Sequence, residues 1–476
     1  MNFIAKSNGF DEERQVVMYT FKGGTHVREY KNTDSAPIER MPAPPTVAIP
    51  MSQHIGAPCR PVVKPWDHVD YGQLIGEVEQ GLGCPVHASV SGTVKKIETR
   101  LSAQGNPVEV VILENDGLYT KSDRIKPFPK PLEEATPDEI VEVIRSAGIS
   151  GMGGATFPTY AKLKGAIGKA DTLIINCAEC EPFITANHRM MLEHPERIID
   201  GTRVLMQALG LKRALIGVED NKPDAIALLR EKAPTYIKIC TLKTKYPQGD
   251  ERQLMYALLG KELPTGKLPA DIGCVIFNAE TVAAIWHAFF NGTPLCKRVV
   301  TVDGDCVGRP ANVKVPLGTS YRDLIEYCGG LIKQPERIIN GGPMMGNAQW
   351  DFNASITKGS SSILALSHEF CQKGHSSLPS ACIRCGRCVK NCPMHLMPNM
   401  LVNFAMRRRW DDAAAYHVMS CVECGTCSYN CPGGMQIVQH IRVAKATIRA
   451  AQTAARMREA ALEKEKKGEV ASSERK

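Results

Sequence analysis

Two short cysteine runs carry the strongest chemical signal in the sequence. The first, CIRCGRCVKNCP, covers residues 382–393, and the second, CVECGTCSYNCP, covers residues 421–432. Each run has the spacing C-x2-C-x2-C-x3-C followed by proline. Three cysteines at this spacing can wrap three iron corners of a 4Fe-4S cube, because each iron takes one thiolate. Zinc ribbons use C-x2-C pairs and disulfides join separate loops, so we expect two iron–sulfur clusters.

The fourth ligand of each cube must come from outside its own loop. In two-cluster ferredoxins, which share this spacing, the last cysteine of each run binds the other cluster. We therefore assign one cube to Cys382, Cys385, Cys388 and Cys431. We assign the other cube to Cys421, Cys424, Cys427 and Cys392. The intervening segment FAMRRRWDDAAAYHVM is rich in helix-favouring residues, which predicts an α-helical ferredoxin domain over residues 366–450.

Length and composition indicate a multidomain globular protein. The chain has 476 residues, of which 43% are hydrophobic and 23% charged, and this length exceeds what one core usually holds. No apolar stretch approaches the roughly 18 residues of a membrane-spanning helix, and the start, MNFIAKSNGFDEER, lacks the apolar core of a secretory signal. The 18 cysteines then suggest a reducing compartment. We expect the protein in the cytoplasm or on the cytoplasmic face of a membrane.

The net charge of +8 does not by itself select a partner, since nucleic acid, an anionic membrane and an acidic protein would all attract it. The basic excess is diffuse, so we expect no nucleic-acid partner. Residues 451–476 mix both signs of charge, and we predict a solvated helix that frays into disorder and takes no part in the chemistry.

The N-terminal region, residues 1–130, is predicted to be a β domain. The segments TVAIP, QLIGEVEQ, PVHASVSGTVKKIET and VEVVILEN are broken by glycine and proline as short strands are. They resemble the barrel-sandwich hybrid of biotinyl and lipoyl carriers. The carrier lysine is missing from the hairpin GLGCPVHASVSG, so we expect a docking or scaffold role.

The second strong signal is the glycine-rich segment SGMGGATFPTYAKL at residues 150–163. Gly151, Gly153 and Gly154 would let the backbone approach a phosphate, and a helix after Pro158 would point amides and Lys162 towards it. The segments TLIINCAECEP, YPQGDERQLMYALLG and CVIFNAETVAAIWHAFF follow, each a strand or turn that leads into a helix. This order predicts an α/β nucleotide-binding domain over residues 131–294.

These segments resemble the flavin-carrying subunit of respiratory complex I, which binds FMN and oxidises NADH. The resemblance implies a set of cofactor-binding residues: Gly151, Gly153, Gly154, Lys162, Asn176, Glu179, Tyr246, Gly249, Asp250, Asn278 and Thr281. It also implies that Glu179, Glu181 and Glu251 position the nicotinamide or flavin, since hydride transfer needs no proton donor from the protein. Three residues depart from the family pattern: Met152, Ala178 and Phe277 replace arginine, aspartate and asparagine. We interpret the C-x2-C pair of Cys177 and Cys180 as packing.

Residues 295–365 are predicted to form a β-grasp domain. The segment RVVTVDGDCVGRPANVKVPLGTSYRDLIEYCGG alternates with period two, turns at glycines and ends in a helical pattern. It resembles the soluble-ligand-binding β-grasp modules that follow flavin domains of this kind. The predicted fold is therefore a multidomain α+β protein with a barrel-sandwich-like β domain, an α/β flavin domain, a β-grasp domain and an α-helical ferredoxin domain.

The order of these parts, from about Phe21 to about Ala450, resembles the C subunits of the Rnf electron-transport complex. The resemblance implies a peripheral subunit on the cytoplasmic side of the cell membrane, with FMN, NAD(H) and two 4Fe-4S clusters as cofactors. Other Rnf subunits, including integral membrane ones, would be partners, and ferredoxin an indirect one. The complex would couple electron flow between ferredoxin and NAD to movement of Na+ or H+.

Two alternatives remain at the level of the sequence. A cobalamin reductase of bacterial microcompartments shares the flavin and cluster modules, although the opening FKGGTHVREYK favours the Rnf subunit. A non-catalytic electron relay, with a vestigial flavin domain, is the alternative of a different class.

Overall fold

The computed structural model describes residues 17–103, 105–372 and 381–473, with side chains described up to residue 459. The chain forms two compact units. The first unit comprises Met1–Phe21 and His26–Lys373, and the second comprises Lys22–Thr25 and Gly374–Lys476. The opening segment, on which the expectation of no secretory signal depends, lies outside the described residues.

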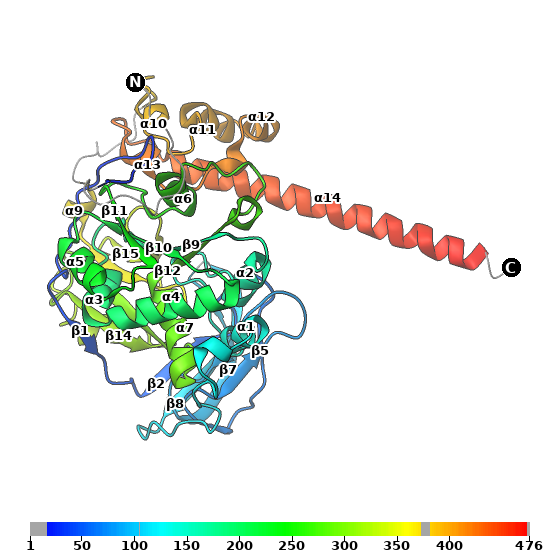
Figure 1. Cartoon of the computed structure of the whole chain (residues 1–476). Helices are drawn as coiled ribbons and strands as arrows, with labels where there is room; N and C mark the ends of the chain where they lie inside the picture. The colour runs from blue at the N-terminus through cyan, green and yellow to red at the C-terminus, as the bar shows by residue number, and fades with distance from the viewer. Residues whose placement is uncertain (1–16, 104, 373–380, 474–476) are drawn as a thin grey trace. The chain divides into compact units, whose positions relative to one another are not determined.

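The N-terminal β domain of the first unit consists of two antiparallel sheets, with strand orders β2-β8-β7-β4 and β3-β5-β6 (Figure 1). Its strands are β2 (Thr46–Pro50), β3 (Arg60–Pro61), β4 (His68–Val69), β5 (Leu74–Glu77), β6 (Val86–His87), β7 (Gly92–Leu101) and β8 (Pro107–Asn115). Alternating apolar residues such as Val47, Ile49 and Leu113 are fully buried between the sheets. The four segments predicted as strands all contribute, and the third divides into β6 and β7.

One N-terminal strand lies elsewhere. β1 (Ile38–Arg40) pairs in parallel with β14 (Ala311–Pro316) of the β-grasp sheet. This strand of the interval 1–130 therefore belongs to a sheet whose other strands lie between residues 297 and 366. A three-residue strand, IER, has too few positions to show period-two alternation, and its partner is far along the chain, so this pairing could not be predicted from the sequence.

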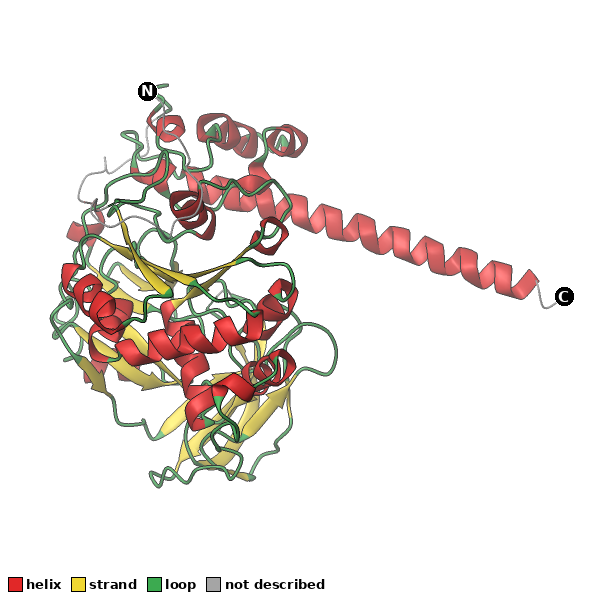
Figure 2. Ribbon diagram, in the orientation of Figure 1, coloured by secondary structure: helices red, strands yellow, loops and turns green. Residues whose placement is uncertain are grey.

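The middle domain is the predicted α/β fold, with a four-stranded parallel sheet in the order β11-β10-β9-β12. Figure 2 shows strands in yellow between helices in red. Its strands are β9 (Thr172–Cys177), β10 (Ala214–Glu219), β11 (Ile237–Leu242) and β12 (Cys274–Asn278). Its helices are α1 (Pro137–Ser146), α2 (Thr159–Ala166), α3 (Ala186–Glu193), α4 (Pro195–Leu209), α5 (Pro223–Lys232), α6 (Glu251–Leu259) and α7 (Ala279–Asn291). The strands are almost continuously apolar, as expected when helices cover both faces of a parallel sheet.

A six-stranded mixed sheet follows, in the order β1-β14-β13-β17-β15-β16. Its further elements are β13 (Lys297–Asp303), β15 (Arg337–Asn340), β16 (Asn347–Gln349), β17 (Ser362–Leu366) and α8 (Tyr321–Tyr327). In this sheet β13 pairs antiparallel with β14 and parallel with β17, and α8 follows β14, as a β-grasp domain would require. The short helix α9 (His368–Gln372) ends the described part of the first unit.

The second unit is helical around the cysteine runs, as predicted. Its helices are α10 (Arg387–Lys390), α11 (Pro398–Met406), α12 (Trp410–Ala415), α13 (Thr426–Tyr429) and α14 (Ile437–Ser473). Leu401, Ile441 and Ala444 are fully buried where α11 packs on the first turns of α14.

The expected fraying of the tail after residue 450 is wrong. The long helix α14 continues without a break to Ser473 (Figure 1). Its residues 451–459 are exposed, as predicted for a solvated helix. The segment is rich in alanine, arginine, glutamate and lysine, which favour helix without tertiary support. Among all described residues, no helix is both long and apolar enough to cross a membrane.

Candidate flavin site and iron–sulfur cavity

The glycine-rich loop connects α1 to α2 and is fixed at its base. The Gly151 amide donates to the Phe157 carbonyl oxygen at 2.8 Å, and the Met152 amide donates to the Thr281 hydroxyl at 2.9 Å. A β-carbon added at Gly153 would lie 3.5 Å from that of Asn278. Gly154 has a φ of +104°, and a β-carbon there would meet nothing within 4 Å. The loop is thus anchored to α7, while Gly154 borders open space where a ligand can approach the backbone.

The polar motif residues lie around this loop, at the carboxyl ends of two neighbouring strands. Asn176 near the end of β9 is in register with Asn278 at the end of β12. The Asn176 amide group donates to the Gly249 carbonyl oxygen at 2.8 Å. The side chains of Lys162 on α2 and Glu251 on α6 form an ion pair. Open α/β sheets bind ligands at the carboxyl ends of their strands, and this is where the motif residues converge.

Two of the motif residues, Asp250 and Asn278, are the N-caps of helices. The Asp250 carboxylate accepts hydrogen bonds from the Arg252 and Gln253 amides at the start of α6. The Asn278 side-chain oxygen accepts from the Glu280 and Thr281 amides at the start of α7. Such N-caps satisfy amides that have no partner within the helix. Asp250 and Asn278 therefore shape the edge of the site through the backbone.

The glutamates of the loop after β9 have different surroundings. Both oxygens of Glu179 accept hydrogen bonds from the start of α3, at 2.6 Å from the Asn187 amide and 3.1 Å from the His188 amide. The backbone of Glu179 is left-handed, with a φ of +55°. This carboxylate is engaged in holding its own loop on α3, which sequence reasoning did not anticipate.

Glu181, the second glutamate of this loop, has different hydrogen-bond partners and a raised pKa. Its carboxylate accepts from the Met344 and Met345 amides at 3.1 and 2.9 Å and from the Tyr246 hydroxyl at 3.4 Å. Burial raises the pKa of Glu181 to about 7, although these three donors oppose the rise. Glu181 therefore changes charge near neutral pH, next to a tyrosine from the third motif segment.

Two lysines that the sequence did not identify hold the carbonyl groups of the same loop. The Lys31 ammonium donates to the carbonyl oxygens of Glu179, Glu181 and Ile184 at 2.9, 2.9 and 2.7 Å. The Lys222 ammonium donates to the Ala178 carbonyl oxygen at 2.9 Å and pairs with Glu219 at 3.2 Å. Burial lowers the pKa of Lys31. A single lysine carries no spacing signal, although Lys31 does close the motif FKGGTHVREYK.

A pocket with an empty volume of about 330 Å³ borders this loop, and Lys31, Glu179, Glu219 and Tyr246 line it together with Cys180. The Cys180 sulfur accepts a hydrogen bond from the Gly249 amide at 3.3 Å. Burial raises the pKa of this thiol. In the described part of the chain, no three His, Cys, Asp or Glu side chains are grouped to hold a single metal ion. Through its bond to the Gly249 amide, Cys180 connects the loop after β9 to the loop before α6.

The three departures from the complex I pattern all put apolar groups beneath the site. Met152 and Phe277 are 2% and 3% exposed, and Ala178 is fully buried. The Lys162 ammonium lies 5.6 Å from the centroid of the Phe277 ring, a cation–π geometry. None of the three side chains can make the polar contact that its family counterpart would make. The remaining features, namely the open glycine backbone, Lys162 and the strand-end asparagines, fit a phosphate-bearing cofactor.

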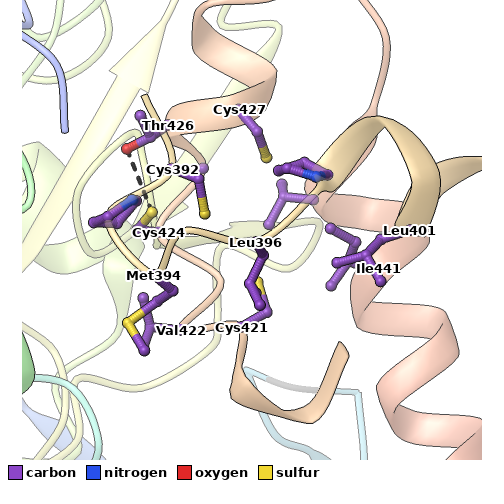
Figure 3. A pocket seen from close by; sticks show the side chains of 14 residues that line it. Cys392, Met394, Leu396, Leu401, Cys421, Val422, Cys424, Thr426, Cys427 and Ile441 are labelled. Atoms are coloured by element: carbon purple, nitrogen blue, oxygen red, sulfur yellow. Dashed lines mark hydrogen bonds between the residues drawn. The ribbon is translucent and has the colours of Figure 1, made fainter. Parts of the chain in front are cut away.

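In the second unit, four thiols from both cysteine runs surround one cavity (Figure 3). Cys392, Cys421, Cys424 and Cys427 line it, and its empty volume of about 360 Å³ includes some space open to solvent. Its other walls include the apolar residues Met394, Leu396, Leu401, Val438 and Ile441. Cys392 of the first run thus lines the same cavity as three cysteines of the second run. A largely apolar cavity lined by four thiols fits a 4Fe-4S cube, which takes one thiolate at each of its four irons.

The two cysteine runs fold into similar loops. Arg384 and Glu423 occupy the same place in each, with φ of +56° and +57°, and Gly386 and Gly425 follow with φ of +71° and +80°. A one-turn helix, α10 or α13, starts directly after each glycine. In the first loop Cys382 and Cys385 are exposed and Cys388 is buried, while Cys431 is partly buried. The assignment of Cys431 to the first cube stays a prediction.

The N-terminal segment Lys22–Thr25 belongs to this unit and packs against the end of the first run. The Gly24 amide donates to the Asn391 carbonyl oxygen at 2.9 Å. Gly23 has a φ of +76°, and a β-carbon there would lie 2.7 Å from the Cys392 carbonyl oxygen. The two glycines of FKGGTHVREYK therefore allow close approach to the backbone of a cavity cysteine.

Four family models match successive parts of the chain. The RnfC barrel sandwich hybrid domain matches residues 19–118, and the Nuo51 FMN-binding domain matches residues 144–287. The SLBB domain matches residues 299–348, and a 4Fe-4S dicluster domain matches residues 381–435. These matches cover the barrel-sandwich, flavin, β-grasp and ferredoxin parts in the order that the sequence predicted.

The relatives agree along most of the chain. The C subunit of the Na+-translocating ferredoxin:NAD+ oxidoreductase complex of Acetobacterium woodii is 44% identical, over 90% of this chain and 97% of its own length. The C subunit of the proton-translocating complex of Clostridium ljungdahlii is 43% identical over 91% and 95%. The C subunit of the ion-translocating oxidoreductase complex of Rhodobacter capsulatus is 40% identical over 80% and 74%.

Among solved structures, a chain of an NAD+-reducing NiFe-hydrogenase shows a weak likeness, with 17% identity and a TM-score of 0.45 over 67% of this chain and 62% of that one. That likeness is too low to carry an argument. The identities with the first two relatives extend over nearly their whole length, so the chain belongs to the family of C subunits of the ion-translocating ferredoxin:NAD+ oxidoreductase complexes, the Rnf complexes.

Proposed function

We propose that this chain is the peripheral electron-transfer subunit of a membrane complex that couples electron flow between NAD(H) and ferredoxin to Na+ or H+ translocation. One observation carries the proposal. Cysteines of both ferredoxin-type runs, Cys392 from the first and Cys421, Cys424 and Cys427 from the second, line one cavity. The curated relatives do not favour a cobalamin reductase.

FMN would be held by the glycine loop and the strand ends beside it. Gly151, Gly153 and Gly154 leave the backbone accessible, and Lys162 supplies positive charge near a phosphate. Asn176 and Asn278 fix the neighbouring loops. When bound, a flavin can take two electrons as hydride from a nicotinamide and release them one at a time.

The nicotinamide would be positioned by Glu181, Tyr246 and Glu251. Glu181 and Tyr246 are joined by a hydrogen bond, Tyr246 lines the pocket beside the loop after β9, and Glu251 is held by Lys162. We assign these groups to orientation, because hydride transfer itself needs no proton from the protein. Glu179 then acts on the site through its bonds to the start of α3.

Two 4Fe-4S clusters would complete the path. Cys392, Cys421, Cys424 and Cys427 would bind one, and Cys382, Cys385, Cys388 and Cys431 the other. Because the relatives are named as subunits of ion-translocating complexes, we propose that other Rnf subunits, including integral membrane ones, bind this chain at the cytoplasmic side of the membrane. Ferredoxin would exchange electrons with it indirectly.

The deciding experiment is a spectroscopic titration of the whole protein. The chain is reconstituted with iron, sulfide and FMN and freed of unbound flavin, and its absorbance is recorded before and after NADH. We expect a flavin band and a broad cluster absorbance that both bleach with NADH. Clusters without retained flavin would identify a relay, and a protein that retains neither would contradict the proposal.

A further inference from the structure

A buried lysine is hydrogen-bonded to one of the four cysteines, Cys392, Cys421, Cys424 and Cys427, that line the cavity. Lys445, on α14, has a side chain that is 5% exposed. Its ammonium group donates to the Cys421 carbonyl oxygen at 2.6 Å and to the Glu423 carboxylate at 2.5 Å. The cation is therefore fixed to the backbone of a cavity cysteine, in a place with little water to screen its charge.

Glu423 connects this charge pair to a sulfur. Its amide donates to the Cys421 sulfur at 3.4 Å, and its carboxylate also pairs with Arg442 at 3.2 Å. Lys445 and Glu423 therefore both bond to Cys421, the lysine at its carbonyl oxygen and the glutamate amide at its sulfur.

The first loop has a different electrostatic surrounding. Arg384 stands where the second loop has Glu423, and it is exposed, as is Lys390. Exposed charges are screened by water and salt, so they influence a nearby group weakly. The two similar loops therefore differ in that only the second, among the described residues, has a buried lysine bonded to a cysteine carbonyl.

We propose that Lys445 and Glu423 set the reduction potential of the cluster held by Cys392, Cys421, Cys424 and Cys427, with the lysine raising it and the carboxylate lowering it. This inference rests on the proposed function, which supplies the cluster. Reduction adds one negative charge to the cluster, so a fixed cation stabilises the reduced form and a fixed anion the oxidised form. Nearby charge, hydrogen bonds to sulfur and solvent exposure are the protein's means of tuning such potentials.

Substitutions of Lys445 and Glu423 are predicted to shift the reduction potential of the cluster in opposite directions. This difference distinguishes an electrostatic effect on the potential from a purely structural role. Lys445→Met removes the buried cation, so the potential should fall. Glu423→Gln removes the carboxylate but keeps the amide that donates to Cys421, so the potential should rise. The double variant should lie between the two. If the pair were only structural, both single changes would loosen the same loop and act in the same direction.

The test is a redox titration of the reconstituted full chain, followed by electron paramagnetic resonance. The relevant signal is the one that disappears in Cys392→Ser. We expect each single variant to change the equilibrium constant for reduction of this cluster at least tenfold. This change corresponds to a shift of about 59 mV for one electron. Arg449→Met is the matched control, because it removes an exposed cation from the same helix and should leave the potential unchanged.

Shifts of both single variants in one direction, or an unshifted potential with the signal intact, would overturn the inference. Failure of Lys445→Met to fold would leave Glu423→Gln to decide, since its potential must rise. If the unaltered chain shows no signal that depends on Cys392, the proposed cluster itself is wrong, and the failure belongs to the proposed function.

Discussion

Cys392 is the residue that tests the crossed assignment of the cluster ligands. It ends the first run but lines the cavity of the second, with Cys421, Cys424 and Cys427. Cys392→Ser should therefore remove the second cluster, leave the first and lower bound iron by about half. Iron analysis and electron paramagnetic resonance of the reconstituted chain check this. Cys371→Ser is the control, since Cys371 belongs to the first unit. Loss of the first cluster's signal instead would refute the crossed assignment.

Gly23 supports the same cavity from a distant part of the chain. Gly23→Ala should lower cluster incorporation at the second site, because the new methyl group would lie 2.7 Å from the Cys392 carbonyl oxygen. The left-handed backbone adds a cost of roughly 1–2 kcal/mol. Gly117→Ala is a matched control, with a φ of +74° and nothing within 4 Å of the added carbon. Equal cluster content in both variants would show that the contact with Cys392 is unimportant.

The sequence indicated the residues whose function depends on spacing. The cysteine runs and the glycine loop were recognisable because each ligand or backbone position recurs at a fixed interval. Lys31, Lys222 and Lys445 were not, because each acts alone on carbonyl groups that are distant in sequence. The structural role of Glu179 was missed for a similar reason, since the motif marks the residue without showing which helix its carboxylate caps.

At the scale of elements, the loop after β9 depends on a residue of the N-terminal segment. Lys31→Met should destabilise this loop, because three carbonyl groups lose their donor. Each unsatisfied buried group costs about 1–3 kcal/mol. We expect a lower unfolding temperature and a higher KM for NADH, with flavin still bound by the glycine loop. Lys164→Met, which alters an exposed lysine on α2, is the control and should change neither. An unchanged KM together with an unchanged unfolding temperature would rule out this anchoring.

The same loop should give the protein a pH dependence. Burial raises the pKa of Glu181 from its ordinary 4.5 to about 7, so the folded state binds a proton that the unfolded state has released. The contribution of this group to stability is therefore complete below about pH 4.5 and is lost as the pH rises through 7. Denaturant unfolding across that window should show the decline, and Glu181→Gln should flatten it. An equally steep decline in the variant would assign the effect to another group.

Strands and helices with long periodic patterns could be predicted from the sequence. The short strand β1 and the full length of the solvent-exposed end of α14 could not. The apolar strands of the middle domain and the helices that follow them could be predicted from the sequence. β1 could not, because three residues hold no period and pair with a strand far along the chain. A solvated helix was predicted beyond residue 450, but mixed charge was taken as a sign that it frays, whereas α14 continues to Ser473 because the same residues favour helix.

At the scale of the whole molecule, the two proposed cofactor sites belong to different units. The flavin-motif residues all lie in the first unit, and the cavity cysteines all lie in the second. The segment Lys22–Thr25 is assigned to the second unit although it lies within the N-terminal part of the sequence. Damage to one site should therefore leave the other able to bind its cofactor, while electron transfer through the chain stops.

Gly153→Trp tests this independence. A β-carbon at Gly153 already lies 3.5 Å from Asn278, so a methyl group would fit there but an indole would fill the space beside the loop. We expect the variant to lose FMN and NADH-dependent reduction of the clusters, while dithionite still reduces them. Flavin fluorescence after denaturation and the cluster signal from electron paramagnetic resonance measure the two sites separately. Gly165→Ala, which adds a methyl group to open space on α2, should retain both. Unchanged flavin content in Gly153→Trp would move the flavin site away from the glycine loop, and loss of the dithionite-reduced signal would show that the two units do not hold their cofactors independently.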